Sequence, residues 1–282
     1  MLNVENLSFS YGRGKRKKEV FRHFSLTLEQ GHTYGLLGKN GVGKSTLLYL
    51  MSGLLTPREG RVTYQGLDVR GRLPETLSSL FLVPEEFELP PLSLNEYVKL
   101  NSGFYPRFSY EDLTGYLRLF ELEPDLQLGS LSMGQKKKVY MSLAFAANTS
   151  LLLMDEPTNG LDIPGKSQFR RLVASGVTEG RTVLISTHQV RDIDRVLDHV
   201  LIVDNSRVLL NRSVEEICAR FAFRESDDRQ LAAQAFYAPP SPQGNSLMLP
   251  NDGCQETEIN LELLFGATLA MPEEVEKKFI NR

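Results

Sequence analysis

The sequence predicts an α/β fold built on a mostly parallel sheet, and three observations lead to this fold class. An apolar strand over residues 33–37 runs into the Gly-rich segment Gly38–Thr46 and then into an apolar helical stretch. From residue 150 onward, apolar strands alternate with helical patterns, as in parallel sheets whose strands are joined by crossover helices. Before residue 29, apolar and polar positions instead alternate, which indicates a separate set of antiparallel strands.

The Gly-rich segment Gly38–Thr46, called here the phosphate loop, matches the pattern Gly-x-x-x-x-Gly-Lys-[Ser/Thr]. Glycines let backbone N–H groups curl around phosphates, and the following helix N-terminus adds partial positive charge. We expect Lys44 to reach the β- and γ-phosphates of a bound nucleotide as a catalytic cation, and Ser45 to offer its hydroxyl to Mg²⁺. The expected nucleotide-binding residues of the loop are Gly38, Asn40, Gly41, Gly43, Lys44, Ser45 and Thr46.

A second chemical feature is the apolar strand Leu151–Met154, which ends in two carboxylates, Asp155 and Glu156. Ligands of open α/β sheets bind at the carboxyl ends of the strands. We therefore expect Asp155 to hold Mg²⁺, directly or through water. Glu156 is the expected catalytic residue that polarises the attacking water.

Composition sets limits on the function. The chain has 282 residues and a net charge of −3, so one large domain, with or without an extension, is expected, and no nucleic-acid partner. Its two cysteines, Cys218 and Cys254, lack metal or redox spacing, which is typical of a reducing cytosol. We see no signal peptide and no apolar run of the ~20 residues that span a bilayer. Any membrane role is therefore expected to act through a partner.

Capping boxes and periodicity give the remaining elements. Helical periodicity follows the first box to about residue 123, with a break over 101–108, and follows the second box to residue 147. The three boxes are Ser93 with Glu96, Ser132 with Gln135, and Ser213 with Glu216. Further helices are predicted over 164–178 and 189–197, and further strands over 2–11, 20–28, 61–65, 79–83, 182–186, 199–204 and 207–210.

Two segments have open roles. The basic stretch Arg13–Lys18 lies between the first two strands and is either a solvated hairpin tip or a contact for phosphates or lipid headgroups. Residues 221–282 are acidic, with a linker-like segment at 239–244 and an amphipathic helical segment over 259–280 that is interrupted near Pro272. This end of the chain is either a helix packed on the domain edge or a regulatory element.

At the second capping box, Leu131–Gln135, the chain resembles the ATP-binding subunits of ABC transporters, whose signature reads Leu-Ser-Gly-Gly-Gln. The other family motifs follow in the family's order: the acidic strand, then Asn159–Asp162, then Ser186–His188. The resemblance covers roughly residues 1–215 and is strongest overall to bacterial exporters of the ABC-2 kind.

The resemblance implies a P-loop NTPase fold of ABC type. It has a mostly parallel core sheet, an antiparallel β subdomain and an inserted α-helical subdomain, here over residues 86–148. The ATP-binding domain would span residues 1–215, and a small C-terminal extension of unknown role would span 216–282.

The resemblance also implies that two ATP-binding subunits, in the simplest case a homodimer, pair head to tail around two ATP molecules. Ser132, Gly134 and Gln135 would then contact ATP held by the other chain, and Asp162 would reach the opposite site. His188 would contact the γ-phosphate in its own chain as a catalytic residue. Closure on ATP binding and opening after hydrolysis would drive transport.

Three positions carry further expectations. Tyr11 ends the first strand, where the family has an aromatic residue stacked on adenine. Glu85 stands where the family has a glutamine that reaches Mg²⁺, so we expect a metal set of Ser45, Glu85 and Asp155. The alternative is that Glu85 weakens the coupling between site and partner. Met133, in place of the first signature glycine, is the second departure.

The region of residues 86–130 corresponds to the part of the family that receives a separate transmembrane permease. The chain is therefore expected at the cytoplasmic side of the membrane, attached through that permease and powering transport, with export as the expected direction. Two other functions stay open from the sequence: a soluble ABC-type ATPase, and a regulatory module that binds ATP without hydrolysing it.

Overall fold

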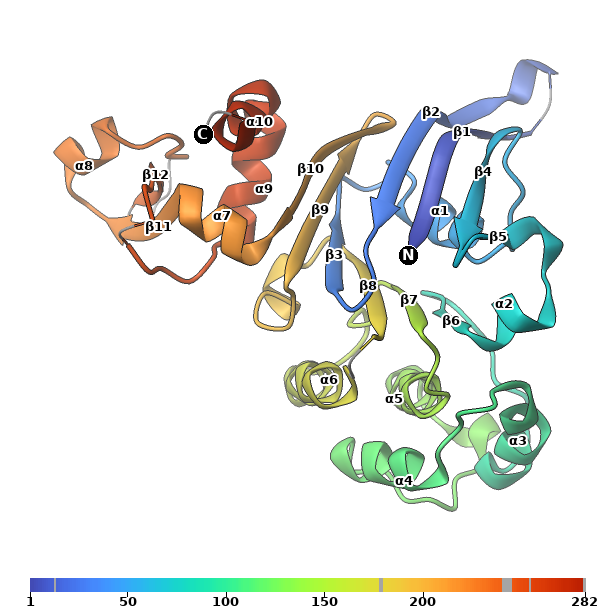
Figure 1. The fold of residues 1–282 in the computed structure, drawn as a ribbon. Helices are drawn as coiled ribbons and strands as arrows, with labels where there is room; N and C mark the ends of the chain where they lie inside the picture. Colours follow the sequence, from blue (N-terminus) through green and yellow to red (C-terminus); the bar gives the residue numbers. More distant parts are fainter. Residues whose placement is uncertain (13, 178–179, 240–244, 254, 281–282) are drawn as a thin grey trace.

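The computed structural model describes residues 1–12, 14–177, 180–239, 245–253 and 255–280. Most of the predicted linker 239–244, residue 178 at the end of a predicted helix, Arg13 and Cys254 lie outside the described residues. Figure 1 shows two sheets side by side, a helical region below them, and the C-terminal elements beyond one sheet edge.

The first sheet is antiparallel and confirms the alternation in the sequence. Its strand order is β2-β1-β4-β5. The strands are β1 (Leu2–Tyr11), β2 (Lys18–Leu28), β4 (Glu59–Tyr64) and β5 (Leu67–Asp68). Leu2 pairs with Leu28 on one side and with Tyr64 on the other, so β1 lies in the middle.

The second sheet has the order β10-β9-β3-β8-β7-β6, with all neighbours parallel except β9 and β10. Its strands are β3 (Thr33–Leu37), β6 (Leu80–Val83), β7 (Leu151–Asp155), β8 (Thr182–Thr187), β9 (His199–Asp204) and β10 (Arg207–Ser213). The mostly parallel core sheet is thus confirmed. Since the strands are parallel, β3, β7 and β8 deliver their carboxyl ends to one edge.

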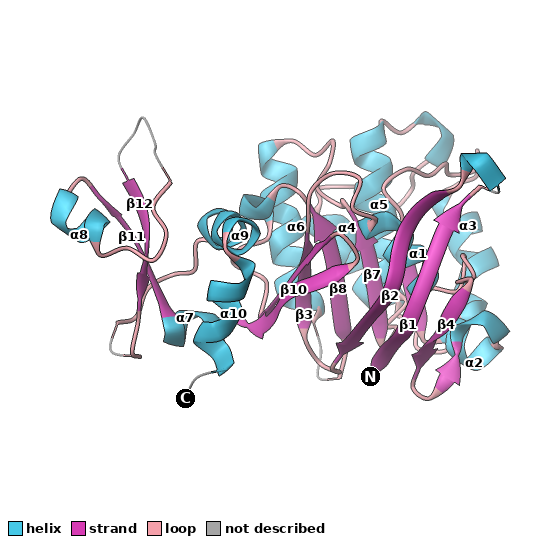
Figure 2. Ribbon diagram, turned by 90° about the horizontal axis from the view of Figure 1, so that it is seen from above, coloured by secondary structure: helices cyan, strands magenta, loops and turns pink. Residues whose placement is uncertain are grey.

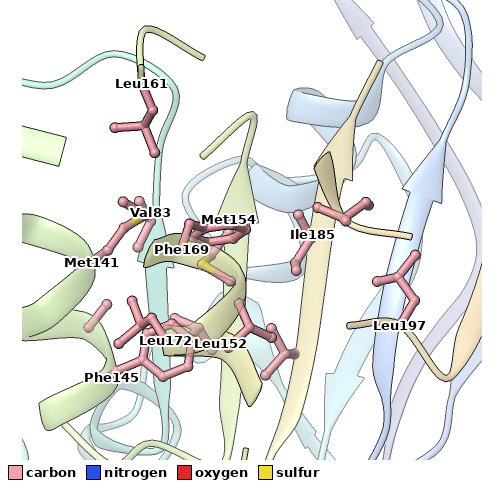
Figure 3. Close-up of a cluster of buried hydrophobic side chains, with 14 of the residues drawn as sticks. Val83, Met141, Phe145, Leu152, Met154, Leu161, Phe169, Leu172, Ile185 and Leu197 are labelled. Atoms are coloured by element: carbon pink, nitrogen blue, oxygen red, sulfur yellow. The ribbon is translucent and has the colours of Figure 1, made fainter. Parts of the chain in front are cut away.

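Both faces of the parallel sheet are buried, and successive residues of β7 point to opposite faces. Leu151 and Leu153 pack toward the antiparallel sheet and helix α1 (Lys44–Met51). Leu152 and Met154 pack toward α5 (Met133–Ala146) and α6 (Ile163–Gly176). Figure 3 shows this second cluster, with Phe145 and Phe169 against the strand. Burial on both faces explains why the strands read as continuous apolar runs.

The helical region joins β6 to α5 and projects from the sheet (Figure 1). Its helices are α3 (Leu94–Asn101) and α4 (Tyr110–Leu119), and the short α2 (Pro74–Ser78) precedes β6. The predicted break over 101–108 is confirmed, but α4 ends before residue 123, at a turn where Glu121 has a φ of 59°. All three predicted capping boxes are present with both hydrogen bonds.

The prediction of a helix over 189–197 is wrong. Residues 190–192 form a single 3-10 turn, and the following residues continue as turns, held by bonds such as Val196 N to Ile193 O at 3.1 Å. Leu197 packs so tightly on Gly35 that a Cβ added there would meet Leu197 Cδ1 at 2.3 Å. The apolar residues Val190, Ile193 and Leu197 are therefore buried as the pattern predicts, but the backbone forms a 3-10 turn and further turns instead of an α-helix.

Beyond β10 the chain forms a region that lies outside the parallel sheet's edge in both Figure 1 and Figure 2. It contains α7 (Val214–Arg220), β11 (Phe221–Ser226), α8 (Arg229–Ala233), β12 (Asn245–Pro250), α9 (Leu261–Ala270) and α10 (Pro272–Ile280). The helical segment interrupted near Pro272 is confirmed. The antiparallel pair β11–β12 was not predicted. Within the described residues, no helix is long and apolar enough to cross a membrane.

Candidate nucleotide-binding site

The phosphate loop lies between β3 and α1, at the edge where β7 and β8 also end (Figure 1). Gly43 has a φ of 105°, and a Cβ added there would meet Val20 Cγ1 at 2.5 Å. Only glycine fits that position, because the backbone is left-handed and the antiparallel sheet presses against it. The motif and its strand–loop–helix setting are therefore as the sequence predicts.

Lys44 is buried, with its ammonium held inside the loop. Its Nζ donates to Gly38 O at 2.9 Å and lies 4.0 Å from Glu156 Oε1. Burial lowers the pKa of Lys44, while the nearby carboxylates of Glu156, Asp155 and Glu85 act in the opposite direction. A partly desolvated ammonium at the wall of a pocket is suited to bind phosphate oxygens strongly.

Asp155 ends β7 in a pocket of buried polar atoms. Its Oδ1 accepts a hydrogen bond from Ser186 Oγ at 2.5 Å, and its buried Oδ2 has no hydrogen-bond partner among the described residues. Burial raises the pKa of Asp155, and the hydrogen bond from Ser186 and the nearby Ser45 hydroxyl oppose the rise. A buried carboxylate oxygen without a donor is costly unless a cation satisfies it, so the residues fit a hard divalent cation such as Mg²⁺.

Glu156 follows in a left-handed conformation, with a φ of 44°. Its Oε1 lies 2.8 Å from Nδ1 of His188, and its Oε2 accepts from the backbone N–H of His188 at 3.3 Å. Two hydrogen bonds, to the carbonyl and hydroxyl of Ser186, anchor the Glu156 backbone N–H. A non-glycine residue at positive φ persists only where the surroundings fix it, and such residues cluster at functional sites.

Glu85 follows β6 and lines the same pocket as Lys44 and Glu156. Its Oε1 accepts a hydrogen bond from Asn159 Nδ2 at 2.9 Å, and Asn159 Oδ1 accepts from Gln189 Nε2 at 3.0 Å. The neighbouring Glu86 does not line the pocket. The sequence placed Glu85 near the metal, but the links through Asn159 and Gln189 were missed. The only sequence signal for these two residues was their position, because Asn159 follows the acidic strand closely and Gln189 comes directly after His188.

The pocket has a volume of about 420 Å³ and opens beside β1 and β2. Tyr11 lines it, is 43% exposed, and its hydroxyl lies 3.2 Å from Thr46 Oγ1. Tyr11 therefore forms part of the pocket wall and is partly exposed there, which is compatible with the predicted stacking on adenine. Lys18 also lines the pocket. From the sequence, the basic stretch that contains Lys18 was either a solvated hairpin tip or a contact for phosphates or lipid headgroups, and Lys18 was not singled out.

The signature segment Leu131–Gln135 does not join this pocket within the chain. Ser132 caps α5 and is exposed, and Met133 is 53% exposed. Gly134 packs against the loop after β7, where an added Cβ would meet Gly160 O at 3.3 Å. Asp162 caps α6 through the N–H of Gly165 at 2.9 Å. Ser132, Gly134, Gln135 and Asp162 are therefore not brought to the phosphate loop of their own chain.

A phosphate loop, a buried lysine and paired strand-end carboxylates around one pocket define a P-loop ATPase. The family model described as ABC transporter matches residues 21–159. The methionine import ATP-binding protein MetN of Carboxydothermus hydrogenoformans is 32% identical over 77% of this chain and 67% of its own length. The chain therefore belongs to the ATP-binding proteins of ABC transporters, and it binds and hydrolyses ATP to power transport.

Two further similarities concern the extent of the match. YtrB, an ABC transporter ATP-binding protein of Bacillus subtilis, is 29% identical over 94% of this chain and 93% of its own length. A solved structure of an ATP-binding subunit of an ABC transporter is 28% identical, with a TM-score of 0.66 over 77% of this chain and 91% of that one. The YtrB similarity therefore extends into the C-terminal region.

Proposed function

We propose that each ATP is hydrolysed between two copies of the chain paired head to tail. The observation that carries this proposal is the position of the signature segment: Ser132 is exposed and stands outside its own nucleotide pocket. Its capping serine and helix N-terminus supply donors for an anion. In the paired arrangement, Ser132, Gly134 and Gln135 of one copy bind the γ-phosphate held by the other, and Asp162 lies at the shared interface.

The residues of the pocket take distinct roles in this proposal. Lys44 exchanges its carbonyl contacts for β- and γ-phosphate oxygens, and Tyr11 stacks on adenine. Ser45, Asp155 and Glu85 hold Mg²⁺. When bound, that ion neutralises charge that develops on the phosphates. The remaining loop residues, Gly38, Asn40, Gly41, Gly43 and Thr46, enclose the phosphates with their backbone.

Glu156 is the proposed general base. A water attacks the γ-phosphorus as the bond to the ADP oxygen breaks, and Glu156 takes the proton from that water. His188, which lies beside Glu156, turns to the γ-phosphate when ATP is present. In the nucleotide-free protein, the contact with His188 fixes the Glu156 carboxylate. When His188 turns to the γ-phosphate, this contact is lost, so the position of Glu156 depends on whether the phosphate is bound.

We also propose a docking site for a transmembrane permease at the helical region. A groove of about 750 Å³ lies between the α2 segment and the end of α3. Leu54 and Phe104 line it and are 57% and 69% exposed, so two large apolar side chains face solvent in one groove. A short amphipathic helix of the permease would bury both. The chain is then peripheral at the cytoplasmic side of the membrane, with export as the proposed direction.

The ATP-binding domain over residues 1–215 and the extension over 216–282 remain our proposed boundaries. In the extension, α9 packs on β9, β10 and residues 190–192, which follow His188 in the chain. Leu264 of α9 belongs to the same buried cluster as Ile193. We propose that α9 of the extension holds residues 190–193, which follow His188 in the chain, in place by packing against them.

The experiment that tests this function compares steady-state ATP hydrolysis by wild type and Glu156→Gln, together with size-exclusion chromatography in ATP and Mg²⁺. We expect turnover by wild type, and an inactive variant that elutes as an ATP-bound dimer. A hydrolysing wild type whose Glu156→Gln variant stays monomeric would contradict the paired site. If wild type stays inactive even when co-expressed with its permease, the regulatory function would replace the proposed one.

A further inference from the structure

A second cluster of ligating side chains lies at the edge of the parallel sheet opposite the phosphate loop. His32 precedes the first residue of β3, and Asp198 and His199 stand at the start of β9. The two strands are parallel neighbours, with Tyr34 paired to His199. Their amino ends therefore meet at one edge, while the nucleotide binds at the other. We propose that His32, Asp198 and His199 bind one transition-metal ion, with Zn²⁺ as the preferred ion.

The distances between ligand atoms match a tetrahedral zinc site. Nδ1 of His32 lies 3.4 Å from Oδ1 of Asp198, and Nδ1 of His199 lies 3.2 Å from the same oxygen. Bonds of about 2.0–2.1 Å at the tetrahedral angle separate neighbouring ligand atoms by about 3.3–3.4 Å. One ligand atom from each of the three residues lies within 4.8 Å of the other two. Small side-chain rotations would therefore suffice to place an ion between them.

The protein holds these side chains in place before any ion arrives. Thr33 N donates to Asp198 Oδ1 at 3.0 Å, and Val214 N donates to the Asp198 carbonyl at 2.8 Å. The His32 and His199 rings lie 4.4 Å apart, and the His199 ring lies 4.9 Å from the buried ring of Tyr34. Ligands whose positions are fixed by backbone bonds and packing lose little entropy on binding a metal.

The donor set selects the class of ion. Two imidazoles and one carboxylate suit Zn²⁺ and related first-row ions, whereas Mg²⁺ and Ca²⁺ prefer oxygen ligands alone. The side chains of His32 and Asp198 are 33% and 50% exposed, so an ion can enter from solvent and keep a water as its fourth ligand. Bound there, it would join the turn before β3 to the turn before β9. The proposed Zn²⁺ site therefore differs in position and in ligand type from the Mg²⁺ site that Asp155 would form.

The competing account is a triad held by hydrogen bonds only. His199 Nδ1 is within hydrogen-bond distance of Asp198 Oδ1 without any ion. The two accounts differ in one measurable way. A triad gains nothing from zinc, whereas a metal site binds it with a fixed stoichiometry and is stabilised by it.

The test is isothermal titration of Zn²⁺ into the full-length, metal-stripped chain in the presence of excess Mg²⁺ and without nucleotide, so that Mg²⁺ competes for the carboxylates of the nucleotide pocket. We expect one Zn²⁺ per chain, and at least about tenfold weaker binding in both His32→Gln and Asp198→Asn. Asp198→Asn keeps an oxygen for the N–H of Thr33. The matched control is His23→Gln, because His23 is an exposed histidine on β2 of the antiparallel sheet, and its Nδ1 lies 2.9 Å from Asn6 Oδ1.

Two further readouts separate a metal site from a structural role. Co²⁺ should give the strong visible absorption of a tetrahedral site in wild type and His23→Gln, and lose it in His32→Gln. Zn²⁺ should raise the melting temperature of wild type but not of His32→Gln, while their metal-free melting temperatures stay alike. If wild type and His32→Gln bind Zn²⁺ with equal affinity, or wild type binds none, the triad is held by hydrogen bonds only and the proposal is wrong.

Discussion

Glu156 Oε1 lies 2.8 Å from His188 Nδ1, and this contact joins the end of β7 to the end of β8 beside the phosphate loop. The same oxygen lies 4.0 Å from Lys44 Nζ. The Glu156 carboxylate is thus held between an imidazole and a buried ammonium, and in the proposed mechanism it lies next to the γ-phosphate. In that mechanism, Lys44 and His188, which orient it, both contact phosphate oxygens once ATP is bound.

Glu156→Gln should lower ATP turnover by about 10²–10⁴-fold, because removal of a positioned general base costs that much. ATP binding should be retained, since Gln keeps the shape and Lys44 stays in place. The measurement is phosphate release at saturating ATP, with nucleotide affinity measured separately. A turnover loss below tenfold would show that another group activates the water.

Glu85→Gln should change nucleotide and metal binding in opposite directions. Without Mg²⁺, ATP should bind about fivefold or more tightly, because a like-charge repulsion on the order of 1–4 kcal/mol is removed. The Mg²⁺ concentration that gives half-maximal hydrolysis should rise, since a ligand carboxylate is lost. Glu86→Gln is the matched control, because Glu86 does not line the pocket. Equal effects in both variants would show that Glu85 acts only through its negative charge and does not bind the metal ion.

Asp155→Asn should abolish hydrolysis and flatten part of the pH dependence of stability in the nucleotide-free protein. Burial raises the pKa of Asp155 above its ordinary 3.8, so the folded state holds this proton more tightly than the unfolded state. Stability therefore falls as the pH rises past about 3.8, and the loss is complete above the folded pKa. Chemical denaturation of both proteins from acidic to neutral pH measures the difference, which should grow with pH and then level off.

Phe104→Ser should abolish recovery of the chain with its permease, while ATP binding and stability of the isolated chain stay nearly unchanged. Phe104 is 69% exposed, so its loss leaves no cavity. The measurement is co-purification after joint expression. Ile280→Ser is the matched control, since Ile280 is 66% exposed on the C-terminal helix and outside the groove. Loss of the permease in both variants would show that the groove is not the docking site.

Leu264→Ala should cost about 2–5 kcal/mol of unfolding free energy, as a large buried residue does when truncated. Leu264 is fully buried on α9 against the ATP-binding domain. Glu262→Gln, which breaks the exposed ion pair with Arg191, should cost less than about 1 kcal/mol. Urea unfolding with a single transition in both variants would show that α9 and the domain unfold together. Two transitions in wild type would show that they do not.

Much of the fold followed from local physics. The phosphate loop needs glycines at fixed spacing, and the three capping boxes place each serine against a backbone N–H three residues on. Continuous apolar strands such as β7 indicate burial on both faces. These signals involve neighbours in sequence, so they can be recognised without the tertiary structure. The β11–β12 pair was missed because its two strands are separated by a long connection that contains α8 and the prolines Pro239, Pro240 and Pro242.

The sequence by itself determined the parallel sheet, the phosphate loop with Lys44, and the strand that ends in Asp155. Only the tertiary structure decided which distant groups meet: Asn159 with Glu85, Lys18 with the phosphate loop, and His32 with Asp198. Residues 189–197 also form turns where a helix was predicted, and Leu197 at the end of this segment packs closely on Gly35. Local hydrogen bonds and the spacing of apolar residues depend on neighbours in sequence. These contacts instead depend on how strands far apart in the sequence are brought together in one sheet.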